Sequence, residues 1–123
     1  MIHLTEPVRP RVLVIDDDTS MLHLFARLLP DCDVSVTADP HEALVAGSGF
    51  DLVISDYMMP SMTGAELLGR LRAENPAVKT LLVTGHAEIL DAEAPEWWSR
   101  QPHLAKPVAP GVFRETVAGL IAA

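Results

Sequence analysis

Residues 12–18 read VLVIDDD, four apolar residues followed directly by three acids. Apolar runs of this kind, unbroken by polar residues and rich in β-branched side chains, are typical of strands buried on both faces of a parallel sheet. We therefore expect residues 12–15 to form such a strand and the acids to begin the loop after it. Two more strong runs and two weaker ones lie along the chain, at residues 52–54, 81–83, 34–36 and 103–105.

Between these runs the apolar residues change to helical spacing. Met21, Phe25 and Leu28 share one face of the first such stretch, and Phe113 and Val117 mark the last. A strand followed by a helix, five times over, predicts an α/β fold, a (βα)5 doubly wound parallel sheet of five strands.

The fourth helical stretch, residues 88–100, fits this pattern less well. Pro95 interrupts it and Trp97 and Trp98 follow, so we expect a short, bent or irregular helix. The two tryptophans are expected to cover the core, and a partner-binding patch is the alternative.

The composition sets wider limits. The chain has 123 residues, and 9 basic against 17 acidic residues give a formal net charge of −8. This length predicts one domain, residues 11–122, after a loosely held leader, Met1–Pro10. The acidic balance argues against direct binding to nucleic acids or anionic membranes. No segment has the length and apolarity of a membrane span or signal core, and Cys32 is the only cysteine, so a cytoplasmic location is expected.

The residues that follow the predicted strands carry the chemistry. Ligands of an open parallel sheet bind beyond the carboxyl ends of its strands, where the strand order reverses. With a strand order of 2-1-3-4-5, three carboxylates would gather at one point of that edge, beside a hydroxyl and an ammonium group. These groups belong to Asp16, Asp17, Asp56, Thr84 and Lys106.

Such a cluster of carboxylates favours a cation. Two carboxylates about 5 Å apart repel by roughly 3 kcal/mol at an effective dielectric constant near 20. Hard oxygen ligands without histidine or cysteine select Mg²⁺, which commonly bridges to a phosphate. The pattern indicates a phosphoryl-transfer site whose acceptor is itself a carboxylate. Taken alone, residues 16–18 are explained equally well as a turn that caps the first helix. For Asp18, this local role and an influence on the bound metal ion both remain open.

Four segments carry a family resemblance: VLVIDDD at 12–18, SDYMMPSMTG at 55–64, LLVTG at 81–85 and KP at 106–107. The spacing Asp56-x-x-Met59-Pro60-x-Met62-x-Gly64 is the most specific part. Together they resemble the CheY-like receiver domain of two-component response regulators, over roughly residues 11–122. The resemblance implies a flavodoxin-like sheet and a signalling domain rather than an enzyme, either stand-alone or from a hybrid histidine kinase.

The resemblance also implies roles for the acidic positions. Asp56 corresponds to the residue that accepts a phosphoryl group from the phosphohistidine of a histidine kinase or histidine phosphotransfer protein. Asp17 corresponds to a direct ligand of Mg²⁺ (or Mn²⁺), and Asp16 to a neighbouring acid that usually acts through water. The backbone carbonyl of Met58 corresponds to the third protein ligand, and its side chain lies where the family controls access of water to the phosphoryl group.

Further positions correspond to the phosphoryl contacts and the conformational switch. Thr84 corresponds to the hydroxyl that hydrogen-bonds the phosphoryl group, and Lys106 to its ion-pair partner. Gly85 stands where the family keeps a small residue, and His86 where a side chain affects hydrolysis. His103 replaces the usual switch aromatic, so its coupling to Thr84 is expected to be weaker or sensitive to pH.

Two other functions compete with this one. Asp16-x-Asp18 is similar to the motif of aspartate-nucleophile phosphatases, although that family does not explain Asp56-x-x-Met59-Pro60. A receiver fold kept only as a phosphorylation-independent interaction module is the other alternative, and His103 and the broken fourth helix motivate it. The sequence leaves open the cognate kinase, the downstream protein, the lifetime of the phosphoryl group and whether the chain forms a homodimer.

Overall fold

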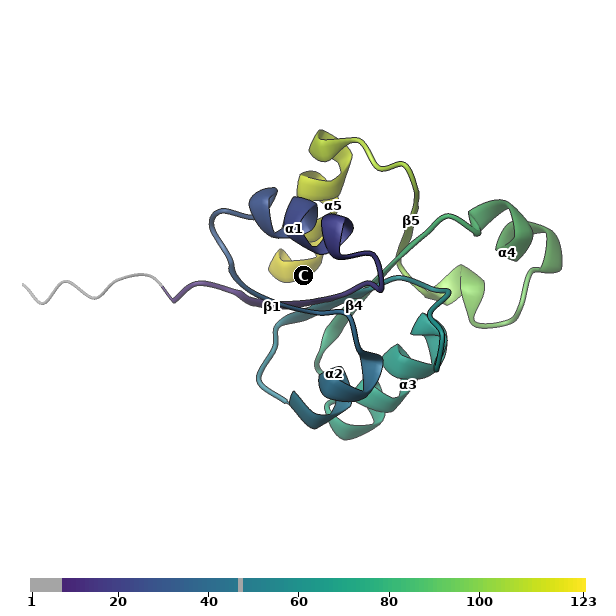
Figure 1. The fold of residues 1–123 in the computed structure, drawn as a ribbon, viewed down its shortest axis with the longest axis horizontal. Coiled ribbons are helices and arrows are strands. Elements are labelled where there is room, and N and C mark those ends of the chain that lie inside the picture. The colour runs from purple at the N-terminus through teal and green to yellow at the C-terminus, as the bar shows by residue number, and fades with distance from the viewer. Residues whose placement is uncertain (1–7, 47) are drawn as a thin grey trace, which may run out of the picture.

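In the described part of the chain, five parallel strands form one sheet in the order β2-β1-β3-β4-β5 (Figure 1). The computed structural model describes residues 8–46 and 48–123. Strand β1 pairs with both β2 and β3, and β4 pairs with β3 and β5, all in parallel. The predicted doubly wound sheet and its strand order are therefore confirmed. The strands are β1 (Arg11–Ile15), β2 (Asp33–Thr37), β3 (Leu52–Ser55), β4 (Lys79–Thr84) and β5 (His103–Ala105).

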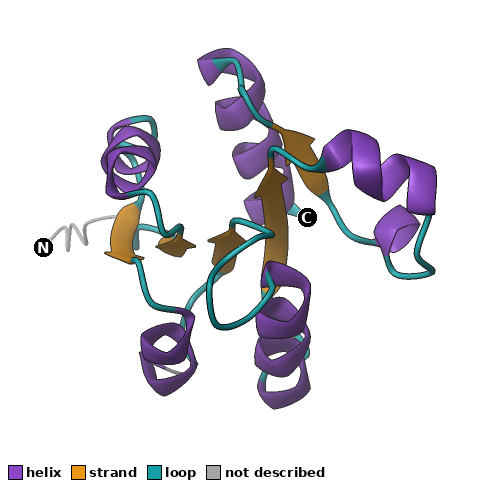
Figure 2. Ribbon diagram, turned by 45° about the vertical axis from the view of Figure 1, so that its right-hand side comes forward, coloured by secondary structure: helices purple, strands orange, loops and turns teal. Residues whose placement is uncertain are grey.

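Helices cover both faces of this sheet. Helices α1 and α5 lie on one face and α2 and α3 on the other, whereas α4 stands to one side near β5 (Figures 1 and 2). The helices are α1 (Thr19–Arg27), α2 (Pro40–Ala46), α3 (Gly64–Glu74), α4 (Ala87–Glu93) and α5 (Pro110–Ala122), with a short 3₁₀ helix, η1 (Trp98–Arg100), after α4.

Each face of the sheet has its own apolar core. Alternate residues of β1 point to opposite faces: Val12 and Val14 join the core under α1 and α5, while Leu13 and Ile15 join the core over α2 and α3. This division explains why the central strands are continuously apolar, since both side-chain rows are buried. Phe25 of α1 stacks on Phe113 of α5 with ring centroids 4.6 Å apart and joins the two helices on their face.

The fourth helix is short and irregular, as its sequence predicts. It ends after seven residues at Ala94, which adopts a left-handed conformation with φ of 45°. Pro95 follows, and its ring prevents continuation of the helix. The chain then turns through η1, where Trp98 is buried and its indole N–H donates a hydrogen bond to Asp91 of α4 at 2.7 Å. Trp98 thus covers the core, as expected, while Trp97 is half-buried.

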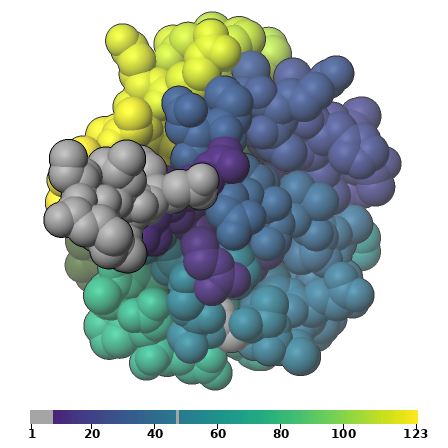
Figure 3. All heavy atoms as spheres, turned by 90° about the vertical axis from the view of Figure 1, so that its left-hand side faces the viewer, coloured from purple at the N-terminus to yellow at the C-terminus, as the bar shows by residue number. Residues whose placement is uncertain are grey.

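Figure 3 views the molecule from the end at which the strands begin, with α5 in yellow and the first described residues in purple. Of the predicted leader, residues 1–7 lie outside the described part of the chain. Pro10 already contacts the domain, because its carbonyl accepts a hydrogen bond from the Asp33 N–H at 2.8 Å. The domain boundaries at residues 11 and 122 stay a prediction. Within residues 8–46 and 48–123, the structure contains no helix with the length and apolarity that crossing a membrane requires.

Candidate functional site

The strand register brings the predicted site residues to one edge of the sheet. Ile15 of β1 is level with Ser55 of β3, so Asp16 and Asp56 leave neighbouring strands side by side. On the other side, Thr84 of β4 is level with the last residue of β5, and Lys106 follows directly. The Lys106 N–H donates to the Thr84 carbonyl at 2.8 Å and holds the two loops together.

Three acids form the cluster that the sequence predicts. One carboxylate oxygen from each of Asp16, Asp17 and Asp56 lies within 4.8 Å of the other two. Asp16 is 1% exposed, Asp56 is half-buried and Asp17 lies on the surface. Oxygen donors at such separations suit a hard divalent cation with several waters. This part of the chain is therefore an acidic pocket with the ligands to hold a metal ion.

Asp18 is not part of this cluster. Its carboxylate accepts hydrogen bonds from the backbone N–H of Ser20 at 3.0 Å and the Ser20 hydroxyl at 2.6 Å. These bonds cap the amino end of α1 and hold the pKa of Asp18 below its ordinary value. Of the two roles left open by the sequence, the structure supports the local cap.

Lys106 lies directly against the acidic cluster. Its Nζ is 2.8 Å from Oδ2 of Asp16 and 3.5 Å from Oδ1 of Asp56. Burial by itself would lower the pKa of this amine, but the hydrogen bond and charge of Asp16, together with Asp56, hold the pKa above its ordinary value. Lys106 is therefore a fixed cation that offsets part of the carboxylate repulsion.

Burial has the opposite effect on Asp56, whose pKa is raised. Loss of solvent is the main cause, the charges of Asp16 and Asp17 add to it, and Lys106 and the N–H of Tyr57 oppose it. Tyr57 donates to Oδ1 of Asp56 at 2.8 Å. The folded chain thus binds a proton at Asp56 more tightly than the unfolded chain does, and ionisation of Asp56 works against folding.

The raised pKa of Asp56 predicts how Asp56→Asn changes the stability of the fold. In a chelator, the wild type should lose stability as pH rises from the ordinary carboxylate pKa through the higher folded pKa of Asp56, because the unfolded state ionises first. Asp56→Asn should therefore melt above the wild type at neutral pH, with the difference shrinking towards pH 4. Thermal melts across this pH range check it, with Asp31→Asn, which removes an exposed acid in the turn before β2, as a control. A neutral-pH melting point below that of the wild type would contradict the prediction.

The segment after β4 lies in the same loop cluster. Thr84 is buried, and its hydroxyl accepts a hydrogen bond from the His86 N–H at 2.9 Å. Gly85 is exposed, with open space where a Cβ would project. Nδ1 of His86 is buried and has no hydrogen-bond partner among the described residues. The side chain of Met58, two residues after Asp56, is 48% exposed and so lies at the surface.

His103, at the predicted switch position, is held by Trp98. The imidazole and indole rings stack with centroids 3.5 Å apart and an interplanar angle of 14°. Nδ1 of His103 lies 2.8 Å from the Gln101 carbonyl, which can only accept, so this nitrogen carries the proton. The imidazole therefore has a defined orientation on the α4 side of β5.

Sequence reasoning assigned no role to two residues that shape the site. Tyr57 supplies the N–H that bonds Asp56. Gly64 packs so closely that a Cβ there would lie 2.0 Å from the Asp56 carbonyl oxygen. Gly64 belongs to the motif at residues 55–64, but its spacing alone does not reveal which backbone atom it meets. Met59 and Met62, by contrast, are buried in the core.

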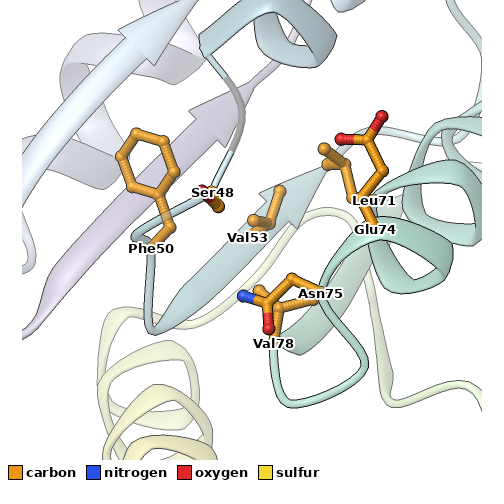
Figure 4. A pocket seen from close by; sticks show the side chains of 7 residues that line it. All are labelled: Ser48, Phe50, Val53, Leu71, Glu74, Asn75 and Val78. Carbon is orange, nitrogen blue, oxygen red and sulfur yellow. The ribbon is translucent and has the colours of Figure 1, made fainter.

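A separate hollow lies near the amino end of β3, between this strand and the end of α3 (Figure 4). Asp56 follows the carboxyl end of the same strand, so this hollow is distinct from the acidic pocket. Its lining is largely apolar, and it brings together no group of metal-ligating or nucleophilic side chains. It is lined by Ser48, Phe50, Val53, Leu71, Glu74, Asn75 and Val78.

The family profile of the response regulator receiver domain matches residues 12–118, most of the chain. This chain belongs to that family. The receiver domain protein (CheY-like) of Methanospirillum hungatei JF-1 has a similar crystal structure, with a TM-score of 0.83 and 26% identity over 94% of this chain and 95% of that one. The chemotaxis protein CheY of Pseudomonas aeruginosa is 31% identical over 85 residues, which are 63% of this chain and 68% of that protein.

The alginate biosynthesis transcriptional regulatory protein AlgB of Pseudomonas aeruginosa is 28% identical over 118 residues, 93% of this chain. The match covers 26% of that protein, and 40% of two other transcriptional regulators. The chain thus spans between a quarter and two fifths of these relatives. Receiver domains are signalling modules of two-component systems, and membership of the family places this chain in phosphorelay signalling.

Proposed function

We propose that this receiver domain accepts a phosphoryl group on Asp56 from the phosphohistidine of a histidine kinase or histidine phosphotransfer protein. The observation that carries the proposal is the half-buried Asp56 carboxylate, with two further carboxylates and the Lys106 ammonium directly around it. A half-buried carboxylate beside a fixed cation suits an acceptor of a phosphoryl group, since it is reachable and its charge is partly offset. The chain would act as a signalling domain whose only reactions are its own phosphorylation and dephosphorylation.

In this proposal a carboxylate oxygen of Asp56 attacks phosphorus, an acyl phosphate bond forms and the bond from phosphorus to the donor imidazole nitrogen breaks. Lys106 leaves its contact with Asp56 to pair with a phosphoryl oxygen, and the Thr84 hydroxyl and Gly85 N–H donate to the others. Met58 and His86 at the rim would set how readily water reaches the acyl phosphate.

Mg²⁺, or Mn²⁺ in its place, would neutralise charge on the phosphoryl oxygens. Asp16, Asp17, Asp56 and the Met58 carbonyl would hold it. The three clustered carboxylates fit this ion because all their donors are oxygen and one of them, Asp17, is open to solvent.

We further propose that phosphorylation changes the face presented to a downstream protein, in the cytoplasm and without direct contact to nucleic acid or membrane. The names of the relatives, a chemotaxis protein and transcriptional regulators, support a switch of this kind. The downstream protein would in one case be a second copy of this chain, so that phosphorylation promotes a homodimer.

A phosphorylation-independent interaction module is the second candidate. The observation that favours it is the stacking of His103 on Trp98. This contact holds the imidazole at the usual switch position against Trp98 and opposes its movement on phosphorylation. The two functions differ in one respect, since only the first requires chemistry at Asp56. The phosphatase alternative has less support, because the second acid of its motif, Asp18, caps α1.

Incubation with acetyl phosphate and Mg²⁺ tests the first function. The intact protein is expected to gain the mass of one phosphoryl group, and EDTA or Asp56→Asn should abolish the gain. Asp51→Asn, which removes an exposed acid at the opposite end of β3, should leave it unchanged. A protein that folds but gains no mass supports the interaction module instead.

Mg²⁺ should also stabilise the fold by relieving carboxylate repulsion. A free concentration ten times Kd adds about 1.4 kcal/mol to the free energy of unfolding, or roughly 5 °C in melting temperature for a domain of this size. Thermal melts with MgCl₂, against NaCl of equal ionic strength, measure the effect. Asp17→Asn should remove most of it, and a wild-type midpoint unmoved by Mg²⁺ would argue against a metal site.

A further inference from the structure

A second surface, away from the acidic pocket, lies between α3 and η1. Two adjoining hollows there share Arg72, Trp97 and Gln101 in their walls. One extends along Arg100 and Pro102, and the other reaches the amino end of α3. In Figure 2, α4 and η1 lie at the edge of the sheet, apart from α3. We call these two hollows the α3–η1 groove.

Arg72 is fixed in this groove by neutral partners. Its Nη1 donates to the Thr80 hydroxyl at 3.1 Å and to Oε1 of Gln101 at 3.0 Å. Thr80 and Gln101 are buried, and Gln101 is itself held by a bond to the Pro102 carbonyl at 2.9 Å. No carboxylate of residues 8–46 and 48–123 forms an ion pair with Arg72. The guanidinium is therefore oriented while its charge stays uncompensated.

The other charges at the groove leave it positive. Among the described residues Arg100 pairs with Glu96 alone, at 3.6 Å between side chains that are 70% and 90% exposed, and such a pair contributes little. Glu66 at the far end is already paired with Arg70 at 3.0 Å. Two available guanidinium groups thus line the same hollow as the half-buried Trp97, in a chain whose net charge is −8.

We propose that the α3–η1 groove binds an acidic segment of a partner protein, with carboxylates on Arg72 and Arg100 and an apolar side chain against Trp97. Charge complementarity selects this occupant: a guanidinium pairs with a carboxylate through two parallel hydrogen bonds, and the pre-oriented Arg72 loses little freedom on pairing. Tryptophan and arginine are also the residues that dominate binding energy at protein interfaces.

Trp97 connects this groove to the phosphorylation site, and this part of the inference rests on the proposed function. Its ring lies 5.8 Å from that of Tyr57, whose N–H donates to Asp56. On its other side Trp97 meets Trp98 edge-on at 5.9 Å, and Trp98 stacks on His103. A row of aromatic rings therefore runs from beside Asp56 to β5 through the groove wall. Binding in the groove and the state of Asp56 should bias each other by the same factor.

The test is selection from a random peptide library displayed on phage, with the full, unphosphorylated chain as target. Enriched peptides should combine Asp or Glu with apolar residues. Synthetic copies should bind about ten-fold more weakly to Arg100→Gln, whose exposed side chain contributes nothing to the core. They should also bind more weakly to Arg72→Gln, and equally well to Arg114→Gln, an exposed arginine of α5. Melting temperatures show that each variant is folded. Enrichment of basic or purely apolar peptides, no enrichment, or binding indifferent to Arg100→Gln would overturn the proposal.

Beryllofluoride with Mg²⁺ separates the groove from the phosphorylation site. Peptide affinity should change on its addition to the wild type and not to Asp56→Asn. An unchanged affinity refutes the link through Trp97 while peptide binding still supports the groove. Peptide binding in a protein that acetyl phosphate fails to modify contradicts the proposed function alone.

Discussion

Gly64→Ala is expected to destabilise the domain by about 3 kcal/mol, the upper range for overpacking a core, and to abolish phosphorylation. The added Cβ would lie 2.0 Å from the Asp56 carbonyl oxygen and 2.8 Å from a methyl of Leu82. The carbonyl belongs to the backbone and cannot rotate away. Gly64 is also tied to this loop by its own N–H, which donates to the Tyr57 carbonyl at 2.7 Å. The substitution must therefore displace the loop that carries Asp56.

Gly69→Ala is the matched control, since Gly69 lies in the same helix and a Cβ added there would meet no described atom within 4 Å apart from its chain neighbours and the nearby backbone of its own helix. It should stabilise the domain by up to about 1 kcal/mol through helix propensity. Urea unfolding of both variants, with the acetyl phosphate reaction run in parallel, measures the contrast. Equal stability of the two variants would contradict the packing argument.

Lys106→Met is expected to cost about 3 kcal/mol of unfolding free energy at neutral pH in a chelator, as for a buried ion pair that loses one partner. The side chains involved are mostly shielded from solvent, 20% exposed for Lys106 and 1% for Asp16. Without the ammonium group, Asp16 and Asp56 would face each other with no cation between them. Mg²⁺ should restore part of the loss by supplying one.

The stability that Lys106→Met loses should depend on pH. The raised pKa of Lys106 means that its stabilising effect is complete below its ordinary pKa and disappears as pH rises through the folded value. The deficit of Lys106→Met should therefore be largest near neutrality and shrink at very high pH. Lys79→Met is the control, because Lys79 makes no ion pair within the described residues. Equal losses from both variants would contradict a specific role for Lys106.

The burial of the strands and the position of the acids at one edge could be predicted because both follow from short-range rules, whereas the strand order 2-1-3-4-5 was a premise of the sequence argument. An unbroken apolar run implies burial on both faces, and the residue after each parallel strand must lie at the same edge. Pro95 likewise had to end the fourth helix, whatever the tertiary context.

Contacts between distant side chains could not be predicted in the same way. Nothing in local pattern places Trp98 on His103, or Arg72 on Gln101, 29 residues away. Lys106 was expected to pair with a phosphoryl group. Its pairing with Asp16 depends on how far the loops after β1 and β5 extend beyond the edge of the sheet. The steric role of Gly64 depends on loop position in the same way. These contacts can be known only from the folded structure, and they determine the electrostatics of the site and the form of the groove.

The position of the phosphoryl group tests the central claim most directly. The protein is treated with acetyl phosphate and Mg²⁺, then with borohydride, which reduces an aspartyl phosphate to homoserine, and the digested peptides are sequenced by mass spectrometry. Homoserine is expected at position 56 alone, and at no position in the sample kept in EDTA. Homoserine at Asp16, Asp17 or any other aspartate, or none in a protein shown to be folded and to bind Mg²⁺, would contradict the account.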